Sequence, residues 1–571
     1  MAGRLNAASA EYEAALGEAP DHADALHLLG LLRVSQGRGE EGTALLRRAA
    51  DRTPGLPAVW YNLSLALSGA RQSEEAIACL QRAVALNPGY AEAHLALGQA
   101  AKAGGRNEEA AASYRRALAA APCDVPLLNR LGIACADVGL LGEAEDCLRR
   151  AVAAAPANAA AHANLGVLFQ RQERLEESVA AFRRALELTP ADPAVLVRLG
   201  MSLTEQNQPQ EAMDCYQAAL AVRPDDPEAL FWLGVLQGEL HRHAEAIATY
   251  QRVLALRPGE VRARFNLALL RLAQGDFAAG LPAYESRWET GQLKPPPHVR
   301  ERPRWAGEPL ADSQTLLLYA EQGFGDTLQF INYAPLAAAR GGRVILQAPS
   351  QLKALLERVP GLAGVFDEDE PLPPFDLQCP LLSLPLVFET RLDTIPPPLP
   401  LTPPPERLAE WAWVRTAGTQ RHVGIAWAGN PKHANDRKRS MSLAIFRRIL
   451  DIRGCRFHLL LPELRAGDEA EFATLPEVAD YRGRIRDFAD TAAIISHLDL
   501  VVTADTAVAH LAGAMDHPLC VLLSFRHDWR WLLDREDSPW YPGARLFRQE
   551  RPGDWDGVLA RVGAELARFV A

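Results

Sequence analysis

Prolines recur every 34 residues through the first half of the chain, at Pro20, Pro54, Pro88, Pro122, Pro156, Pro190, Pro224 and Pro258. The residues between them repeat a two-helix pattern, and a small residue occupies one place in each first helix: Gly30, Ser64, Gly98, Gly132, Gly166, Gly200 and Gly234. A helix pair of this length cannot bury its own apolar face, so neighbouring pairs must stack. The period therefore predicts a curved α-solenoid with a long groove that suits an extended peptide.

In period and in the order of small and aromatic residues, the units resemble the tetratricopeptide repeat, as in "HANLGVLFQRQERLEESVAAFRRALELTP". The resemblance holds in register from Ala23 to about Trp288, and it assigns residues 1–290 to a tetratricopeptide-repeat superhelix. The chain starts inside a second helix, so we expect the first repeat to be incomplete. Such repeats imply a partner protein or polypeptide in the groove.

Asparagine occupies one equivalent position in three repeats, at Asn62, Asn164 and Asn266. A carboxamide donates and accepts hydrogen bonds at once, so it can hold a peptide backbone without reading side chains. The repeat region resembles that of protein O-glycosyltransferases with tetratricopeptide repeats, whose asparagines at this position bind substrate polypeptide. The other repeats interrupt the series with Leu28, Ala96, Arg130, Arg198 and Trp232. The alternative interpretation is a tolerated polar residue on a solvated helix face.

Composition and charge exclude several classes of protein. A formal net charge of −11 argues against a protein that binds duplex nucleic acid, which needs a basic face. No signal segment and no apolar run of membrane-spanning length is present, so stable membrane insertion is not expected. The eight cysteines form no C-x-x-C pair or zinc-type cluster. We therefore predict reduced thiols, a cytoplasmic location, and neither a metal site nor a cofactor.

After Trp288 a segment rich in proline and charge, residues 291–312, predicts an extended linker. From Thr315 short apolar strands alternate with helices, in two series joined by "TIPPPLPLTPPPERL". This alternation predicts parallel sheets covered by helices on both faces. The expected architecture is an α-solenoid followed by two α/β Rossmann-like lobes, residues 313–405 and 406–571. Ligands of such sheets bind beyond the carboxyl ends of the strands.

Three strand-to-helix corners carry polar residues at such ends. The first is "LLLYAEQGFGDTLQF", where Gly323 and Gly325 would let an acceptor approach the backbone. Asp326 is the candidate general base that takes a proton from an acceptor hydroxyl, and Glu321 is the reserve candidate. The alternative for Asp326 is a helix cap, which is compatible with the catalytic role.

The second corner, "IAWAGNPKHANDRKRSMSL", follows a strand and is rich in cations. Cations at the N-terminus of a helix are unfavourable unless an anion binds beside them. The guanidinium group of arginine can donate two parallel hydrogen bonds to phosphate oxygens. A nucleotide diphosphate is the expected anion, and a solvated basic loop is the alternative. The candidate donor-binding residues here are Asn430, Lys432, Arg437, Arg439 and Ser440.

The third corner is "VVTADTAVAHLAGAMDHP", where a buried-type strand meets a helix of small residues. Helix amides with Thr506 can hold phosphate, and His510 lies on the same helix face as Thr506. Asp505 is better suited to sugar hydroxyls, because an ionised carboxylate only accepts hydrogen bonds. The alternative is a helix cap and a satisfied core histidine.

Over about residues 313–571 these three corners, in this order, resemble the bacterial heptosyltransferase-like glycosyltransferases of the GT-B fold. The resemblance implies that Asp326 is the base and that Asp505, Thr506 and His510 contact a nucleotide sugar. Arg439 stands where the family has a donor-binding lysine, so a heptose donor is not implied.

The sequence thus predicts a metal-independent glycosyltransferase that uses a nucleotide sugar. The expected acceptor is a Ser or Thr hydroxyl of a polypeptide held by the repeats. Two alternatives stay open at this point: a non-catalytic repeat scaffold with a nucleotide-binding or degenerate C-terminal region, and an enzyme that glycosylates lipid or polysaccharide.

Overall fold

The computed structural model describes residues 2–70, 72–121, 123–415, 418–429 and 436–571; for residues 2–6, 437 and 438 it describes the backbone alone. The chain divides into two compact units, Met1–Leu236 and Gln237–Ala571. Residues 237–290, which the period assigns to the repeats, therefore belong to the same compact unit as the α/β region.

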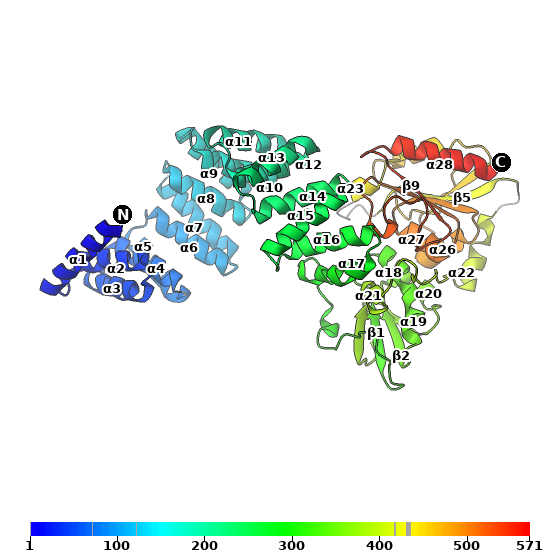
Figure 1. Ribbon diagram of the computed structural model, residues 1–571, viewed down its shortest axis with the longest axis horizontal. Coiled ribbons are helices and arrows are strands. Elements are labelled where there is room, and N and C mark those ends of the chain that lie inside the picture. The colour runs from blue at the N-terminus through cyan, green and yellow to red at the C-terminus, as the bar shows by residue number, and fades with distance from the viewer. Residues whose placement is uncertain (1, 71, 122, 416–417, 430–435) are drawn as a thin grey trace. The chain divides into compact units, whose positions relative to one another are not determined.

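The repeat region is built of antiparallel helix pairs, drawn blue to green in Figure 1. Its α-helices are α1 (Ala2–Glu18), α2 (Ala23–Ser35), α3 (Gly39–Arg52), α4 (Pro57–Gly69), α5 (Ser73–Leu86), α6 (Ala91–Ala103), α7 (Asn107–Ala120), α8 (Val125–Asp137), α9 (Leu141–Ala154), α10 (Ala159–Arg171), α11 (Leu175–Leu188), α12 (Pro193–Glu205), α13 (Pro209–Val222), α14 (Pro227–Glu239), α15 (His243–Leu256), α16 (Val261–Ala273) and α17 (Phe277–Tyr284). The 3-10 helix η1 (Glu285–Glu289) follows α17.

The small residue of each repeat is explained by the partner helix of the same pair. A Cβ atom on Gly98 of α6 would lie 2.2 Å from Cε1 of Tyr114 in α7. At Gly166 the corresponding distance, to Cε1 of Phe182, is 2.6 Å. Such positions allow the two helices to approach closely enough to bury a ring between them, because glycine has no side chain there.

We predict that Gly98→Val destabilises the repeat region by about 1–3 kcal/mol, because the valine would overpack against the Tyr114 ring. The matched control is Gly142→Val in α9, an exposed helical glycine whose Cβ would have no neighbour within 4 Å. Both variants place the same β-branched residue in a helix. Thermal melting followed by circular dichroism measures the difference, and equal melting of the two variants would contradict the prediction.

The segment predicted as an extended linker, residues 291–312, is packed against the first sheet. It contains the 3-10 helix η2 (Pro297–Val299), and Arg304 forms an isolated parallel bridge with Gln378. The backbone N–H of Trp305 donates to the carbonyl of Gln378 at 2.9 Å, and the Trp305 side chain is buried. The predicted linker thus lies against the edge strand β4 (Leu377–Pro380) of the first sheet, where the Trp305 side chain is buried.

The first lobe is a four-stranded parallel sheet in the order β3-β2-β1-β4. Its strands are β1 (Thr315–Tyr319), β2 (Arg343–Gln347), β3 (Leu362–Phe366) and β4 (Leu377–Pro380). Its helical segments are α18 (Phe324–Phe330), η3 (Ile331–Tyr333), α19 (Ala334–Ala338), α20 (Ser350–Leu356), η4 (Leu381–Ser383) and α21 (Leu384–Val387). The strand order reverses at β1, so the carboxyl ends of β1 and β4 flank the topological switch point.

The second lobe is a five-stranded parallel sheet in the order β6-β5-β7-β8-β9. Its strands are β5 (Arg421–Ala426), β6 (Cys455–Leu459), β7 (Leu500–Ala504), β8 (Leu519–Leu523) and β9 (Ala544–Arg548). Its helical segments are α22 (Pro405–Glu410), η5 (Ala412–Val414), α23 (Asp436–Arg439), α24 (Leu443–Phe446), η6 (Arg447–Ile449), α25 (Glu469–Phe472), α26 (Phe488–Ile495), α27 (Ala507–Ala514), η7 (Trp529–Trp531) and α28 (Trp555–Val570). Here the switch point lies between β5 and β7.

The prediction of an α-solenoid followed by parallel α/β lobes is confirmed. Residues 443–449 form one α-helical turn, α24, followed by the 3-10 turn η6. The residues after β4 turn into η4 and α21, because Pro380 and Pro385 lack the N–H group that a sheet needs.

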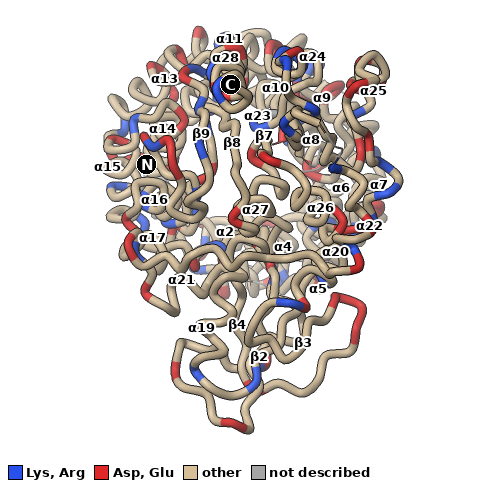
Figure 2. Tube along the Cα trace, turned by 90° about the vertical axis from the view of Figure 1, so that its right-hand side faces the viewer, with Lys and Arg blue, Asp and Glu red and all other residues tan. Residues whose placement is uncertain are grey.

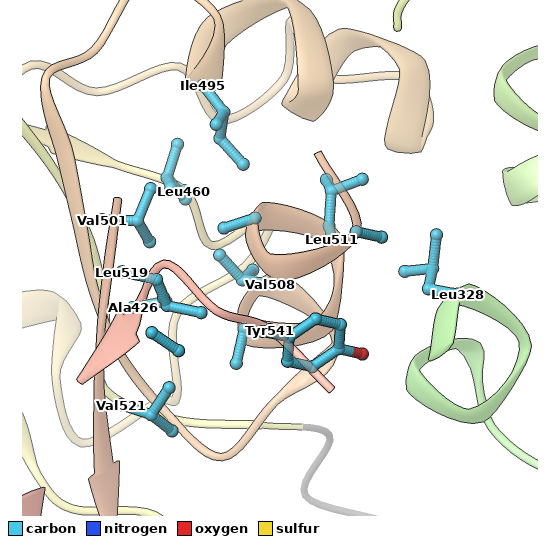
Figure 3. Packing of buried hydrophobic residues seen from close by; sticks show 14 of the residues in the cluster. Leu328, Ala426, Leu460, Ile495, Val501, Val508, Leu511, Leu519, Val521 and Tyr541 are labelled. Atoms are coloured by element: carbon cyan, nitrogen blue, oxygen red, sulfur yellow. The ribbon is translucent and has the colours of Figure 1, made fainter. Parts of the chain in front are cut away.

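The core of this unit is continuous from the first lobe to the second. Leu328 of α18 points toward Leu511 of α27, beside Val508 and Tyr541 (Figure 3). All four side chains are buried. The helices that follow β1 and β7 therefore pack on each other, and the two switch points are joined through apolar contacts.

A buried chain of polar rings crosses the second sheet. The ring nitrogen Nδ1 of His422 lies 3.0 Å from Nε2 of His458, and Nδ1 of His458 lies 2.5 Å from the Tyr481 hydroxyl. Burial, then the neighbouring His422 and Arg456, lower the pKa of His458 from 6.5 to about 3. The folded protein thus holds this histidine neutral at a pH where the unfolded chain would protonate it.

The pH dependence of stability follows from this difference. The contribution of a neutral His458 is complete above pH 6.5 and is lost as the pH falls toward 3, by about 1.4 kcal/mol per pH unit. Between pH 7 and pH 5 we expect the wild type to lose about 2 kcal/mol more than His458→Gln does. Urea unfolding followed by tryptophan fluorescence measures this difference. Parallel pH profiles for the two proteins would refute the assignment.

Candidate functional site

The first corner places Asp326 at the start of α18, at the carboxyl end of β1. One carboxylate oxygen, Oδ2, accepts the backbone N–H of Gly323 at 3.0 Å, which caps the helix. The other, Oδ1, forms an ion pair with Arg530 of the second lobe. The Asp326 side chain is 20% exposed. The capping role is therefore present, and the catalytic role stays a prediction.

Gly325 has a different neighbour from the one that the sequence predicts. A Cβ atom at this position would lie 2.6 Å from Cδ2 of His510 on α27. The space above Gly325 is thus filled by the His510 ring and not left open for an acceptor, which corrects the stated reason for a glycine here. Gly323 is exposed, and a Cβ there would meet only the Asp326 carboxylate, at 3.5 Å.

Glu321 lies in a buried ion pair with an arginine of the repeat end. Its Oε1 lies 3.0 Å from Nη2 of Arg287 in η1, and the two side chains are 2% and 1% exposed. Arg287 also donates to Ser383 at 2.7 Å and to Glu285 at 2.6 Å. Burial raises the pKa of Glu321 to about 7, against the lowering effect of Arg287. This geometry joins the end of the repeats to the first lobe, and the reserve role of Glu321 as a base stays a prediction.

The third corner has the geometry expected of a strand-to-helix turn. Thr506 is the N-cap of α27, and its hydroxyl accepts the Val508 N–H at 3.3 Å. Asp505 directly follows β7 and is buried. Burial, then the neighbouring Asp528, raise the pKa of Asp505 to about 6. The carboxylate is therefore ionised at neutral pH but is protonated readily in mild acid.

His510 is a buried neutral ring at this corner. Its Nδ1 lies 2.9 Å from the Tyr541 hydroxyl, and its ring stacks on Trp531 with centroids 5.3 Å apart. Burial, then the nearby Arg530, lower the pKa of His510 to about 3. Its Nε2 lies 3.8 Å from Oδ1 of Asp505, beyond hydrogen-bond distance. Because the ring is neutral, this contact is not an ion pair.

Part of the second corner lies outside the described residues, namely Asn430 and Lys432, and so does the side chain of Arg437. Ser440 is buried, and its hydroxyl accepts the Gly429 N–H at 3.0 Å and donates to Asp436 at 2.6 Å. Arg439 is partly buried next to Gly429, where a Cβ atom would lie 3.1 Å from Nη2.

Arg439 of the second corner acts electrostatically on the third corner: its charge offsets a small part of the rise in the pKa of Asp505 and adds slightly to the lowering of the pKa of His510. Within the described parts of the chain, Nε of Arg439 is buried without a hydrogen-bond partner.

Arg530 joins the first corner to the third, and sequence reasoning missed it. It lies in η7, after β8, and pairs with Asp326 and with Asp528, the latter at 2.8 Å. Its charge also offsets part of the rise in the pKa of Asp505 that burial causes, and it adds to the lowering of the pKa of His510. The segment "SFRHDWRWLL" follows a buried strand of the same parallel sheet, so the rule that ligands bind beyond strand ends could have identified it.

The three asparagines of the repeats are all partly buried. Nδ2 of Asn62 lies 2.8 Å from Nε2 of His27, in the preceding repeat. Nδ2 of Asn266 donates to the Tyr250 hydroxyl at 3.1 Å. At least two of these amides thus have partners within the protein, and the peptide-binding role stays a prediction.

Three further observations concern membrane-spanning helices, metal-binding clusters and the distribution of charge over the described residues. Among the described residues, no helix combines the length and apolar character needed to cross a membrane. Over the same residues, no group of three or more His, Cys, Asp and Glu side chains is arranged to hold a metal ion. Figure 2 shows basic and acidic positions interspersed along the described trace.

Comparison with protein families finds repeats in the first half of the chain and a glycosyltransferase segment near its C-terminal end. The tetratricopeptide repeat matches residues 1–66 and 236–295, and the C-terminal domain of cilia and flagella-associated protein 70 matches residues 48–236. Glycosyltransferase family 9 (heptosyltransferase) matches residues 483–526. This last segment contains Asp505, Thr506 and His510.

The chain is similar to protein FlbA of Caulobacter vibrioides, with 28% identity over 335 residues that cover 53% of this chain and 54% of FlbA. The chain thus spans about half the length of this curated relative. Among solved structures, it is similar to pilF of Pseudomonas aeruginosa (20% identity, TM-score 0.32, 36% of this chain and 95% of that one). A thermophilic TPR protein of Thermus thermophilus has 26% identity and a TM-score of 0.28, over 32% of this chain and 99% of that one. The chain consists of a helix-pair solenoid that matches the tetratricopeptide repeat, followed by a parallel α/β region in which residues 483–526 are similar to glycosyltransferase family 9.

Proposed function

We propose that the protein is a glycosyltransferase that moves a sugar from a nucleotide-sugar donor to a hydroxyl acceptor. The proposed acceptor is a Ser or Thr side chain of a polypeptide bound by the repeats. The observation that carries this proposal is the ion pair between Asp326 and Arg530, which joins the helix after β1 of the first lobe to the segment after β8 of the second. The family 9 match over residues 483–526 supports the same reaction class.

In the proposed reaction the acceptor oxygen attacks the anomeric carbon of the donor, and its proton passes to the carboxylate of Asp326. The bond between the anomeric carbon and the phosphate oxygen breaks, and the nucleoside diphosphate leaves. Arg439 and the amides at the start of α27, with Thr506, stabilise the charge on that leaving group. Asp505 accepts hydrogen bonds from sugar hydroxyls.

We propose that arginine charge, rather than a metal ion, stabilises the leaving group. Transfer should then be unchanged in the presence of EDTA. Complete loss of transfer in EDTA that magnesium restores would overturn this part of the proposal and leave the reaction class intact.

The test of the function is thermal stabilisation by a panel of nucleotides and nucleotide sugars. A ligand at 100 times its Kd stabilises the folded state by about 2.7 kcal/mol. We expect one nucleotide class to raise the melting temperature of the wild type, and the shift to be lost in Asp505→Ala and in Arg439→Ala. Arg448→Ala is the matched control, because Arg448 is exposed and pairs with Asp556 away from the site.

The two alternative functions, a non-catalytic scaffold and an enzyme that glycosylates lipid or polysaccharide, predict other results in the binding and transfer measurements. A folded protein that no nucleotide stabilises would favour the non-catalytic scaffold. Transfer of labelled sugar into a lipid fraction, with none into polypeptide, would favour an enzyme that glycosylates lipid or polysaccharide.

A further inference from the structure

Arg530 is a buried cation held between carboxylates of both lobes. Its side chain is 7% exposed. Nη2 forms the ion pair with Asp326 of α18, and Nη1 lies 2.8 Å from Asp528, the N-cap of η7. Asp326 and Arg530 are 204 residues apart in sequence. A cation this deep needs both partners, because an unpaired buried charge is strongly destabilising.

Aromatic rings fix the guanidinium in place. Its central carbon lies 4.8 Å from the ring centroid of Trp529 and 5.5 Å from that of Phe330, within the range of cation–π attraction. The Trp529 ring in turn meets Tyr284 of α17, with centroids 6.0 Å apart. Arg530 is therefore held from the end of the repeats, the first lobe and the second lobe.

Both oxygens of Asp326 are oriented by this arrangement. Oδ2 accepts the Gly323 N–H, and Oδ1 faces the Arg530 guanidinium. A general base must lie within hydrogen-bond distance of the proton that it takes, and small displacements of reacting groups lower rates strongly. The titratable groups that interact with Arg530 are Asp326, Asp528, Tyr284, Tyr541, Asp505 and His510.

We propose that Arg530 is a positioning residue for Asp326, which it holds from across the lobe boundary where the acceptor hydroxyl gives up its proton. This inference rests on the proposed function. It goes beyond it by adding a second-lobe residue that acts on the first-lobe base. It gives the η7 segment a role in proton transfer rather than in donor binding.

The test compares Arg530→Gln and Arg530→Lys with the wild type by measuring kcat and kcat/KM for sugar transfer as a function of pH. Arg526→Gln is the matched control, since it breaks an ion pair of the same segment, with Glu239 at 2.6 Å, without contacting Asp326. Melting temperatures with and without the nucleotide that stabilises the wild type report folding and donor binding separately.

In Arg530→Gln we expect the acid limb of kcat/KM to move up by about one pH unit or more, because a carboxylate loses its cationic neighbour. In Arg530→Lys the positive charge remains but the planar, forked guanidinium is lost. The acid limb of the kcat/KM profile should therefore stay where it is in the wild type, while kcat falls by about tenfold to a hundredfold. The nucleotide shift is retained in both variants. The control variant Arg526→Gln should keep the acid limb and the kcat of the wild type.

A folded Arg530→Gln protein with the wild-type acid limb and kcat would overturn the positioning role while leaving the proposed function standing. Loss of the nucleotide shift in a folded Arg530→Lys protein would also overturn it and assign Arg530 to donor binding. Absence of transfer by the wild type with every donor that stabilises it would instead count against the proposed function itself.

Discussion

Replacing Asp326 by asparagine is expected to lower kcat for sugar transfer by about 10²- to 10⁴-fold, the range for loss of a general base. Asparagine keeps the size of the side chain and can still accept the Gly323 N–H that caps α18. It cannot take the proton of the acceptor. Donor binding, measured as the nucleotide-induced rise in melting temperature, should be retained.

Loss of Asp326 also removes one partner of a buried arginine, and the control must account for this. Asp528→Asn is the matched variant, because it too removes an Arg530 partner, at 2.8 Å, while leaving Asp326 in place. We expect Asp528→Asn to lower kcat far less than Asp326→Asn does. Equal losses in the two variants would mean that the charge of Arg530, and not a base at Asp326, explains the effect.

The repeats were predictable because their signal is local and periodic. A proline every 34 residues and a small residue at Gly98 or Gly166 are visible in the sequence without any knowledge of what they contact. The structure supplies the reason, which is that the ring of Tyr114 or Phe182 lies where a Cβ atom would stand. Stacked repeats contact their neighbours, so the local pattern determines the fold there.

The parallel sheets were predictable for a similar reason, since each strand is a short apolar run that a helix follows. The rule that sites lie at the carboxyl ends of strands then placed Asp326 and Asp505 at the ends of β1 and β7. Placing these two residues requires only the order of strands and helices along the chain. That order does not predict which side chains reach the same positions from elsewhere in the chain.

The unpredicted part of the candidate site consists of contacts between residues far apart in sequence. The pairing of Arg530 with Asp326 and the packing of His510 on Gly325 depend on how the two lobes meet, and no local pattern encodes it. Gly325 shows the consequence. The loop sequence predicts space for a substrate at this glycine, whereas in the structure the His510 side chain of the second lobe fills that space.

Burial changes the chemistry of residues that the sequence identifies correctly. At the third corner, the pKa of Asp505 rises to about 6 and that of His510 falls to about 3, in both cases chiefly because the groups are buried. A sequence pattern of carboxylate, hydroxyl and imidazole therefore predicts which groups are present but not their protonation. At neutral pH His510 is uncharged and Arg530 is paired with two carboxylates, which leaves Arg439 as the cation proposed for an anionic donor.

Arg439→Ala is accordingly expected to slow transfer by about a hundredfold or more, since a well-placed cationic donor to a leaving group contributes roughly 3 kcal/mol. Arg439 lies beside Gly429 at the end of β5, its charge acts on Asp505, and its Nε has no partner within the described residues. Arg439→Lys should recover part of the rate, because lysine restores the charge without the fork that matches two phosphate oxygens. Steady-state transfer rates for the two variants, with Arg448→Ala as the control for loss of an arginine in the same lobe, decide the question. A wild-type rate in Arg439→Ala would remove Arg439 from the donor site and shift attention to the α27 amides and Thr506.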